Sequence, residues 1–86
     1  MTTYQAVVYT RPGCMKCRAT QRALTKLGIP VTMNPIDDDQ RALGIMADNG
    51  WAELPLVEVY GPDETFTWAG MSSDNLRALE YLVEGN

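Results

Sequence analysis

The feature that most constrains this 86-residue chain is a pair of cysteines spaced C-x-x-C, at Cys14 and Cys17. They are the only cysteines in the sequence. A short apolar run from Ala6 to Tyr9 precedes them, and a helical pattern from Arg18 to Leu27 follows. The pattern predicts a strand, a tight turn and a helix, with a dithiol at the helix N-terminus.

This position would make Cys14 reactive. The first backbone N–H groups of a helix have no partner, and the helix dipole places a partial positive charge there. Both effects stabilise a thiolate and lower the pKa of a cysteine. Cys17 lies one turn later on the same face, so it could resolve a mixed disulfide formed by Cys14. Lys16 adds a positive charge nearby. The residues therefore predict reversible thiol–disulfide exchange.

Three other interpretations of the pair stay open at this point. Half of a zinc site would need further ligands from a second chain, because the sequence has no His and no other Cys. An inert structural disulfide would close a loop too small to restrict the unfolded chain much. Two buried structural thiols are the third alternative. The strand–turn–helix context favours the redox interpretation over all three.

Composition narrows the class of protein. A formal net charge of −4 argues against nucleic-acid binding, which needs a basic surface. No apolar run approaches the roughly 18 residues that span a membrane, and the N-terminus lacks the pattern of a signal peptide. We expect one cytoplasmic domain over residues 1–86, without a metal, in a compartment where a C-x-x-C is catalytic more often than structural.

Hydrophobic patterning predicts an α/β fold of order βαβαββα, with three helices on a four-stranded sheet. A hairpin after a βαβ unit cannot extend the sheet in all-parallel fashion, so the sheet should be mixed. The expected strands are Tyr4–Thr10, Val31–Ile36, Leu56–Tyr60 and Thr65–Trp68. The expected helices are Cys14–Leu27, Gln40–Asn49 and one that starts at an N-cap on Ser73 and ends before Gly85.

Several single residues carry two interpretations. Arg11 either favours the thiolate by its charge or is a solvated loop residue. The acidic run of residues 37–39 should cap the second helix rather than bind a metal. Pro55 opens the third strand, where a proline is permitted, and the low frequency of cis X–Pro bonds favours trans. Trp51 and Trp68 are either hydrophobic anchors or partner contacts.

The element order, with C-x-x-C after the first strand and a proline opening the third, resembles the thioredoxin superfamily. The chain is short and begins directly with the strand and helix that flank the C-x-x-C, which is similar to glutaredoxins. Several of its segments resemble the NrdH-type redoxins. The similar segments are Val8-Tyr9-Thr10-Arg11, Cys14-Met15-Lys16-Cys17, Gly50-Trp51 before Leu54-Pro55, and Trp68-Ala69-Gly70.

This resemblance implies a thioredoxin/glutaredoxin-like fold and specific roles. Cys14 would be the nucleophile, Cys17 the resolving thiol and Pro55 a cis-proline, with the Leu54 backbone binding substrate. The carrier would bind no cofactor, receive electrons from NADPH through thioredoxin reductase, and reduce the large subunit of class Ib ribonucleotide reductase. We expect a monomer, because no feature of the sequence demands more. The implied partner-binding residues are Arg11, Met15, Lys16, Leu54, Pro55, Trp68, Gly70 and Met71.

The chain departs from these families at two places. Glutaredoxins carry C-P-Y-C and a Gly-Gly pair that holds glutathione, whereas this chain has Met15-Lys16 and Ala69-Gly70. NrdH-type redoxins continue W-S-G-F-R-P-D after the fourth strand, and here Ala69, Met71 and Ser72-Ser73 interrupt that pattern. Two alternatives therefore accompany the NrdH interpretation: a glutathione-dependent glutaredoxin, and a non-catalytic binding module on the same scaffold.

Overall fold

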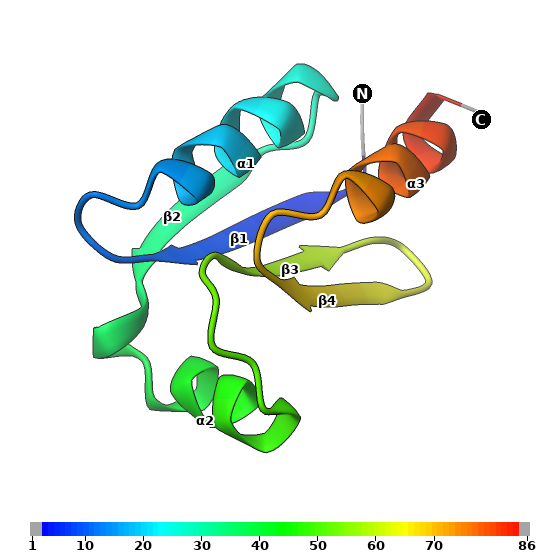
Figure 1. Ribbon diagram of the computed structural model, residues 1–86. Coiled ribbons are helices and arrows are strands. Elements are labelled where there is room, and N and C mark those ends of the chain that lie inside the picture. The colour runs from blue at the N-terminus through cyan, green and yellow to red at the C-terminus, as the bar shows by residue number, and fades with distance from the viewer. Residues whose placement is uncertain (1–2, 85–86) are drawn as a thin grey trace.

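The computed structural model describes residues 3–84 and contains one mixed sheet with helices on both faces (Figure 1). The strands are β1 (Gln5–Thr10), β2 (Val31–Pro35), β3 (Leu56–Tyr60) and β4 (Thr65–Ala69). The helices are α1 (Met15–Lys26), α2 (Gln40–Asn49) and α3 (Ser73–Glu84), with a short 3-10 helix, η1 (Ile36–Asp38), before α2. The thioredoxin-like fold predicted from the sequence is confirmed, with element ends that coincide with the predicted ones or differ by one residue.

The strands are ordered β2-β1-β3-β4 across the sheet. β1 pairs with β2 in parallel and with β3 in antiparallel fashion, and β4 pairs antiparallel with β3. The predicted mixed sheet is therefore confirmed. β2 is an edge strand that ends at Pro35, in agreement with the rule that proline is tolerated at sheet edges.

Two apolar layers cover the sheet (Figure 1). α1 and α3 lie on one face, where Val8, Leu24 and Val57 are fully buried. α2 lies on the other face, where Met46 and Leu56 are buried. Because β1 and β3 are covered on both sides, their sequences are nearly continuous apolar runs instead of alternating ones.

Local signals fix the helix ends. The Asp39 carboxylate accepts a hydrogen bond from the backbone N–H of Ala42 at 2.9 Å, so Asp39 caps α2 as predicted for the acidic run. Gly50 ends α2 in the left-handed conformation, with φ of 67°. The predicted N-cap at Ser73 is wrong. The Ser72 hydroxyl accepts from the backbone N–H of Asn75 instead, so the helix begins one residue earlier than expected.

A buried acid on β3 connects the sheet to α2. Glu58 is only 4% exposed, and its carboxylate accepts hydrogen bonds from Arg41 at 2.6 and 3.0 Å. The hydroxyls of Tyr9 and Tyr60 also donate to it, at 3.3 and 2.8 Å. A buried carboxylate is tolerated only when it is paired and hydrogen-bonded. We infer that this network fixes α2 against the sheet.

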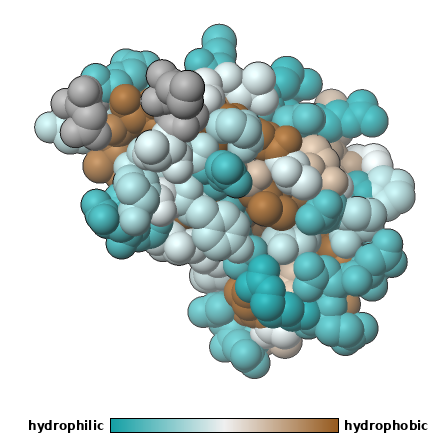
Figure 2. Space-filling model, turned by 180° about the vertical axis from the view of Figure 1, so that it is seen from behind, coloured by the Kyte–Doolittle hydropathy of each residue, from teal (hydrophilic) through white to brown (hydrophobic). Residues whose placement is uncertain are grey.

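Figure 2 shows one face on which hydrophilic residues predominate and hydrophobic residues lie in separate patches between them. Of the helices between residues 3 and 84, none is long and apolar enough to cross a membrane.

Candidate redox site

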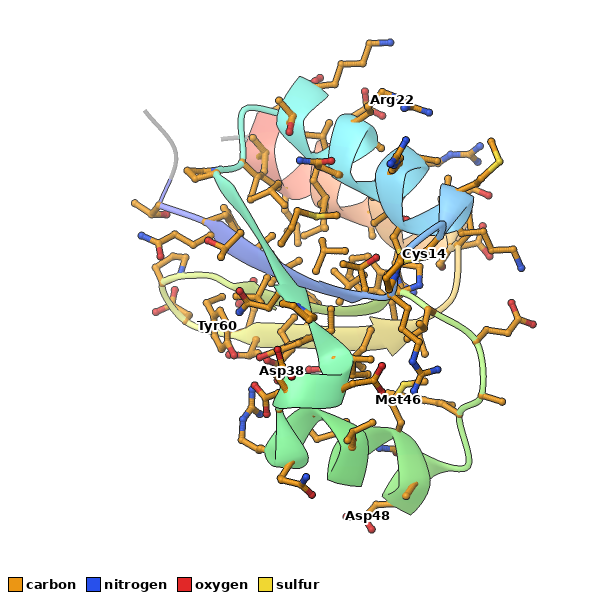
Figure 3. The ribbon with its side chains drawn as sticks, turned by 90° about the vertical axis from the view of Figure 1, so that its left-hand side faces the viewer. Cys14, Arg22, Asp38, Met46, Asp48 and Tyr60 are labelled. Carbon is orange, nitrogen blue, oxygen red and sulfur yellow. A yellow bond between two sulfur atoms is a disulfide. The ribbon has the colours of Figure 1, made fainter. Side chains whose placement is uncertain are left out.

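The two cysteines form a disulfide at the start of α1, with their Cα atoms 5.3 Å apart. Cys14 is the N-cap residue, and its Sγ accepts a hydrogen bond from the backbone N–H of Cys17 at 3.1 Å. Cys14 is half-buried, whereas Cys17 is fully buried. The same N–H can donate to a Cys14 thiolate once the bridge is reduced, and only Cys14 is open to attack a target. Figure 3 shows Cys14 where α1 meets the end of the sheet.

Two basic residues beside the disulfide, Lys16 and Arg11, are paired with acids from other segments. Lys16 Nζ lies 3.0 Å from Glu53 Oε1, which connects α1 to the segment before β3. The Arg11 guanidinium donates to both carboxylate oxygens of Asp37 at 3.0–3.2 Å. This hydrogen-bonded pair lowers the pKa of Asp37 and raises the pKa of Arg11. Neither pairing was predicted from the sequence, because the partners are far apart along the chain. Asp37 was expected to cap α2 with its two neighbours, but it pairs with Arg11 and leaves the cap to Asp39.

The segment before β3 carries the predicted proline. The Leu54–Pro55 peptide bond is cis. This confirms the expectation from the family resemblance, and not the expectation from the low general frequency of cis X–Pro bonds. The Pro55 carbonyl oxygen accepts a hydrogen bond from the Gly70 backbone N–H at 2.8 Å. Gly70 is buried with φ of 83°, a conformation that glycine adopts without strain. Leu54 is half-buried and packs against both apolar layers.

The remaining predicted residues differ in exposure. Met15 is 82% exposed and Met71 is 46% exposed, with the Met71 Sδ 3.3 Å from the Thr20 hydroxyl on α1. Trp68 is only 6% exposed and packs in the core between the sheet, α1 and α3. Its position favours the hydrophobic-anchor interpretation over a partner contact. Trp51 is half-buried against the α2 layer.

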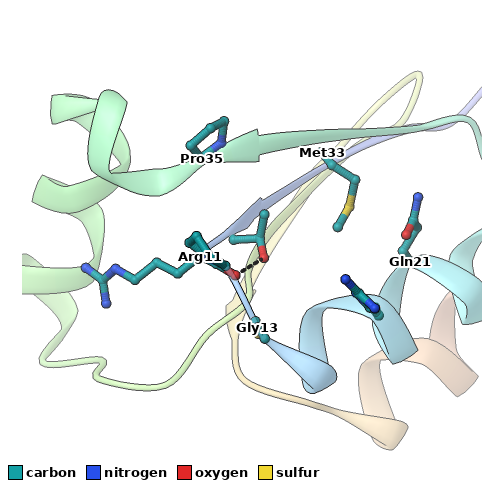
Figure 4. Close-up of a pocket in the computed structure, with 9 residues that line it drawn as sticks. Arg11, Gly13, Gln21, Met33 and Pro35 are labelled. Carbon is teal, nitrogen blue, oxygen red and sulfur yellow. Dashed lines mark hydrogen bonds between the residues drawn. The ribbon is translucent and has the colours of Figure 1, made fainter.

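A hollow of about 390 Å³ opens beside Cys14, between α1 and the edge strand β2. Figure 4 shows Gln21 of α1 and Met33 of β2 on its two sides, while the Arg11 side chain extends away from it. Arg18 also contributes to its lining. The sequence did not predict this hollow, because the residues of α1 and β2 that line it come from separate parts of the chain. Among residues 3–84, no group of three or more His, Cys, Asp or Glu side chains could hold a metal ion.

A C-x-x-C disulfide that caps a helix, on this sheet and with a cis-proline before β3, defines a thiol–disulfide oxidoreductase of the thioredoxin fold. The glutaredoxin family model matches residues 6–62, well over half of the chain. The chain therefore belongs to the glutaredoxin family.

Relatives and solved structures agree with this assignment. The chain is 31% identical over 72 residues to the glutaredoxin-like protein NrdH of Escherichia coli K12, covering 84% of each protein, and 29% identical to NrdH of Salmonella typhimurium. The solved NrdH-redoxin of Escherichia coli superimposes with a TM-score of 0.65 and 29% identity, over 87% of this chain and 93% of that one. Chloroplastic thioredoxin z, at 14% identity over 99% of this chain and 81% of that one, shares the fold, with a TM-score of 0.64. The chain is an NrdH-like member of the family.

Proposed function

We propose that this protein is a small electron carrier of the NrdH type. Thioredoxin reductase would reduce its disulfide at the expense of NADPH, and the reduced dithiol would in turn reduce the large subunit of class Ib ribonucleotide reductase. The observation that carries the proposal is the position of Cys14, half-exposed at the N-cap of α1 over a fully buried Cys17. The similarity to NrdH supports the choice of partners, because the solved Escherichia coli relative is described as having a thioredoxin-like activity profile.

The exchange proceeds in two steps. The Cys14 thiolate attacks one sulfur of the target disulfide, forms a mixed disulfide and expels the other target sulfur, which takes up a proton. Cys17 then loses its proton and attacks the Cys14 sulfur, which forms the Cys14–Cys17 bond and releases the second target thiol. Two electrons pass from the dithiol to the target. The reductase returns the carrier to the dithiol form, so NADPH acts only through that partner.

The surroundings of the dithiol support a site for a protein substrate. The ion pair between Lys16 and Glu53 shows that the segment before the cis-proline lies close to α1. The half-buried Leu54 lies at the position where the family presents backbone groups to a bound extended chain. Met15 and Met71 are exposed, pliable apolar groups on α1 and on the loop before α3, suited to a protein contact. We place the carrier in the cytoplasm as a monomer, with residues 1–86 as one domain.

A parallel assay of the two reducing systems tests the proposal. Reduction of insulin disulfides is followed with NADPH and either thioredoxin reductase or glutathione plus glutathione reductase. We expect turnover with thioredoxin reductase alone, and then deoxyribonucleotide formation when class Ib ribonucleotide reductase is added. Turnover with glutathione alone would identify a glutathione-dependent glutaredoxin. An intact dithiol that turns over with neither system would indicate a binding module.

A further inference from the structure

Charge is divided unevenly along the chain. Residues 1–36 contain no Asp or Glu, so all 11 acidic residues follow residue 36. The basic residues show the opposite distribution, since five of the 7 lie between residues 11 and 26. They are Arg11, Lys16, Arg18, Arg22 and Lys26. An acidic protein with a net charge of −4 therefore contains one strongly basic helix, α1, with its preceding loop.

Three of these residues have no carboxylate partner among residues 3–84. Arg11 pairs with Asp37, and Lys16 pairs with Glu53 on the side of the cis-proline. The unpaired residues are Arg18, Arg22 and Lys26, all exposed. A spacing of four residues places them along one face of the helix, over about 12 Å. We call these three residues the basic stripe, and Figure 3 shows Arg22 extending from α1 away from the sheet.

The basic stripe runs from the disulfide along a hollowed surface. The hollow beside Cys14 is lined by Arg18 and Gln21 (Figure 4). A second hollow, of about 740 Å³, is lined by Gln21, Arg22 and Lys26 among others, so the two share Gln21. A chain that lies along this surface can therefore reach the Cys14 sulfur at one end and all three unpaired cations along its length.

We propose that the basic stripe docks an acidic segment of the protein whose disulfide Cys14 reduces. The proposal rests on the electron-carrier function and adds the chemistry by which a target is chosen. Three exposed cations without internal partners are complementary to about three carboxylates spaced along a short segment. A nucleic acid is disfavoured, because its closely spaced phosphates would extend past the 12 Å stripe onto a protein otherwise rich in acids.

Synthetic peptides with one internal disulfide test this docking. Three peptides differ only in the residues that flank the disulfide, which are three Glu, three Gln or three Lys. Reduced protein in excess is mixed with each, and the rate of peptide reduction is measured after acid quench. Three exposed ion pairs predict that the Glu peptide reacts about fivefold faster than the Gln peptide at low salt. The ratio should approach one at about 0.5 M NaCl, where exposed charges are screened.

Charge-matched variants locate the effect. Arg22→Gln removes one cation from the basic stripe, and Arg77→Gln removes one exposed cation from α3. We expect the Glu-to-Gln rate ratio to fall by about half in the first variant, as for one exposed ion pair, and to stay unchanged in the second. The triple variant R18Q/R22Q/K26Q should bring the ratio close to one. A wild-type ratio of one, or a triple variant that keeps the wild-type ratio, would overturn the proposal.

Two further measurements separate docking from exchange. Reduction of bis(2-hydroxyethyl) disulfide, which is neutral, should be equal in the wild type, Arg22→Gln and Arg77→Gln, and its failure in the wild type would refute the carrier function itself. In the triple variant, which also lacks Arg18 beside Cys14, the same reaction measures the intrinsic reactivity of Cys14. Binding of a cysteine-free Glu peptide to the oxidised protein, followed by NMR shifts on α1, tests docking without chemistry. Binding of this peptide should be lost in the triple variant only. Tighter binding of a single-stranded oligonucleotide of equal charge, or self-association that depends on the stripe, would overturn the proposed occupant.

Discussion

The backbone N–H of Gly70 donates a hydrogen bond to the carbonyl oxygen of Pro55 at 2.8 Å. This bond connects the end of β4 to the segment before β3, whose Glu53 pairs with Lys16 of the C-x-x-C motif. Gly70 has a φ of 83°, and a Cβ added there would lie 3.4 Å from Oε1 of Glu53, the partner of Lys16. The backbone of Gly70 therefore joins two segments of the candidate site, in a conformation that glycine adopts without strain.

Replacement of this glycine should affect both stability and exchange. In Gly70→Ala, a left-handed conformation is forced on an alanine, which should lower the free energy of unfolding by about 1–2 kcal/mol. The strained backbone should also weaken the hydrogen bond from Gly70 to the Pro55 carbonyl and slow insulin reduction, although the new methyl group lies at an ordinary contact distance from Glu53. Gly28→Ala is the matched control, because Gly28 has a φ of 80° and nothing within 4 Å of the added Cβ. Urea unfolding of the control should show a similar loss, with exchange unchanged. Equal loss of exchange in both variants would contradict a local role for Gly70.

The resolving step can be tested by trapping. In Cys17→Ser, the mixed disulfide between Cys14 and its target has no internal thiol to release it, so it should accumulate and turnover should fall to background. Mass spectrometry under non-reducing conditions measures the trapped complex. Cys14→Ser is the control and should trap nothing, because the remaining Cys17 is fully buried. Equal trapping by both variants would mean that the assigned order of attack is wrong.

The sequence predicted those parts of the fold that depend on local signals. These signals are helix ends set by nearby residues. The C-x-x-C pair begins α1, Asp39 caps the start of α2 and Gly50 ends it. The buried Glu58 was not predicted, since its stabilising partner Arg41 comes from another element. The cis bond at Pro55 was predicted only by resemblance, because local sequence gives the opposite expectation.

In the candidate site, too, the features set by local sequence were predicted and those set by tertiary contacts were not. The two cysteines were found from spacing alone, whereas the acids that pair with Arg11 and Lys16 lie 26 and 37 residues away from them. Burial also decided between alternatives that the sequence left open, as for Trp68, which lies in the core. Long-range pairing and burial are tertiary properties, so a pattern along the chain could not supply them.

Two neighbouring acids, Asp39 and Asp38, allow a controlled test of the N-terminal cap of α2. Asp39→Ala removes the carboxylate that accepts from the backbone N–H of Ala42, and should lower the free energy of unfolding by about 1 kcal/mol. Asp38→Ala removes an adjacent exposed carboxylate and should change stability by less than about 0.5 kcal/mol. Thermal unfolding of both variants at pH 7 measures the difference. A loss of the same size in each would show that the cap is not the source.

The network around Glu58 should make stability depend on acid pH. Hydrogen bonding from Arg41 lowers the pKa of Glu58 below its ordinary value of 4.5, against the opposing effect of burial. Because the pKa is lower in the folded protein, the ionised carboxylate stabilises the fold fully above pH 4.5. That stabilisation is lost as the pH falls through the folded-state pKa. Arg41→Gln removes hydrogen bonds to a charged acceptor, so it should cost about 2 kcal/mol at pH 7.

Urea unfolding of the wild type and Arg41→Gln at pH 7 and pH 3 tests the role of Glu58 ionisation. The difference between the two proteins should be largest at pH 7 and smaller at pH 3, because protonation of Glu58 below pH 4.5 removes the charge that Arg41 pairs with. Arg11→Gln is the control, since it breaks a pair that is exposed on both sides and should change stability much less. A difference that is the same at both pH values would show that Arg41 acts through packing of its stem, and not through the charge of Glu58.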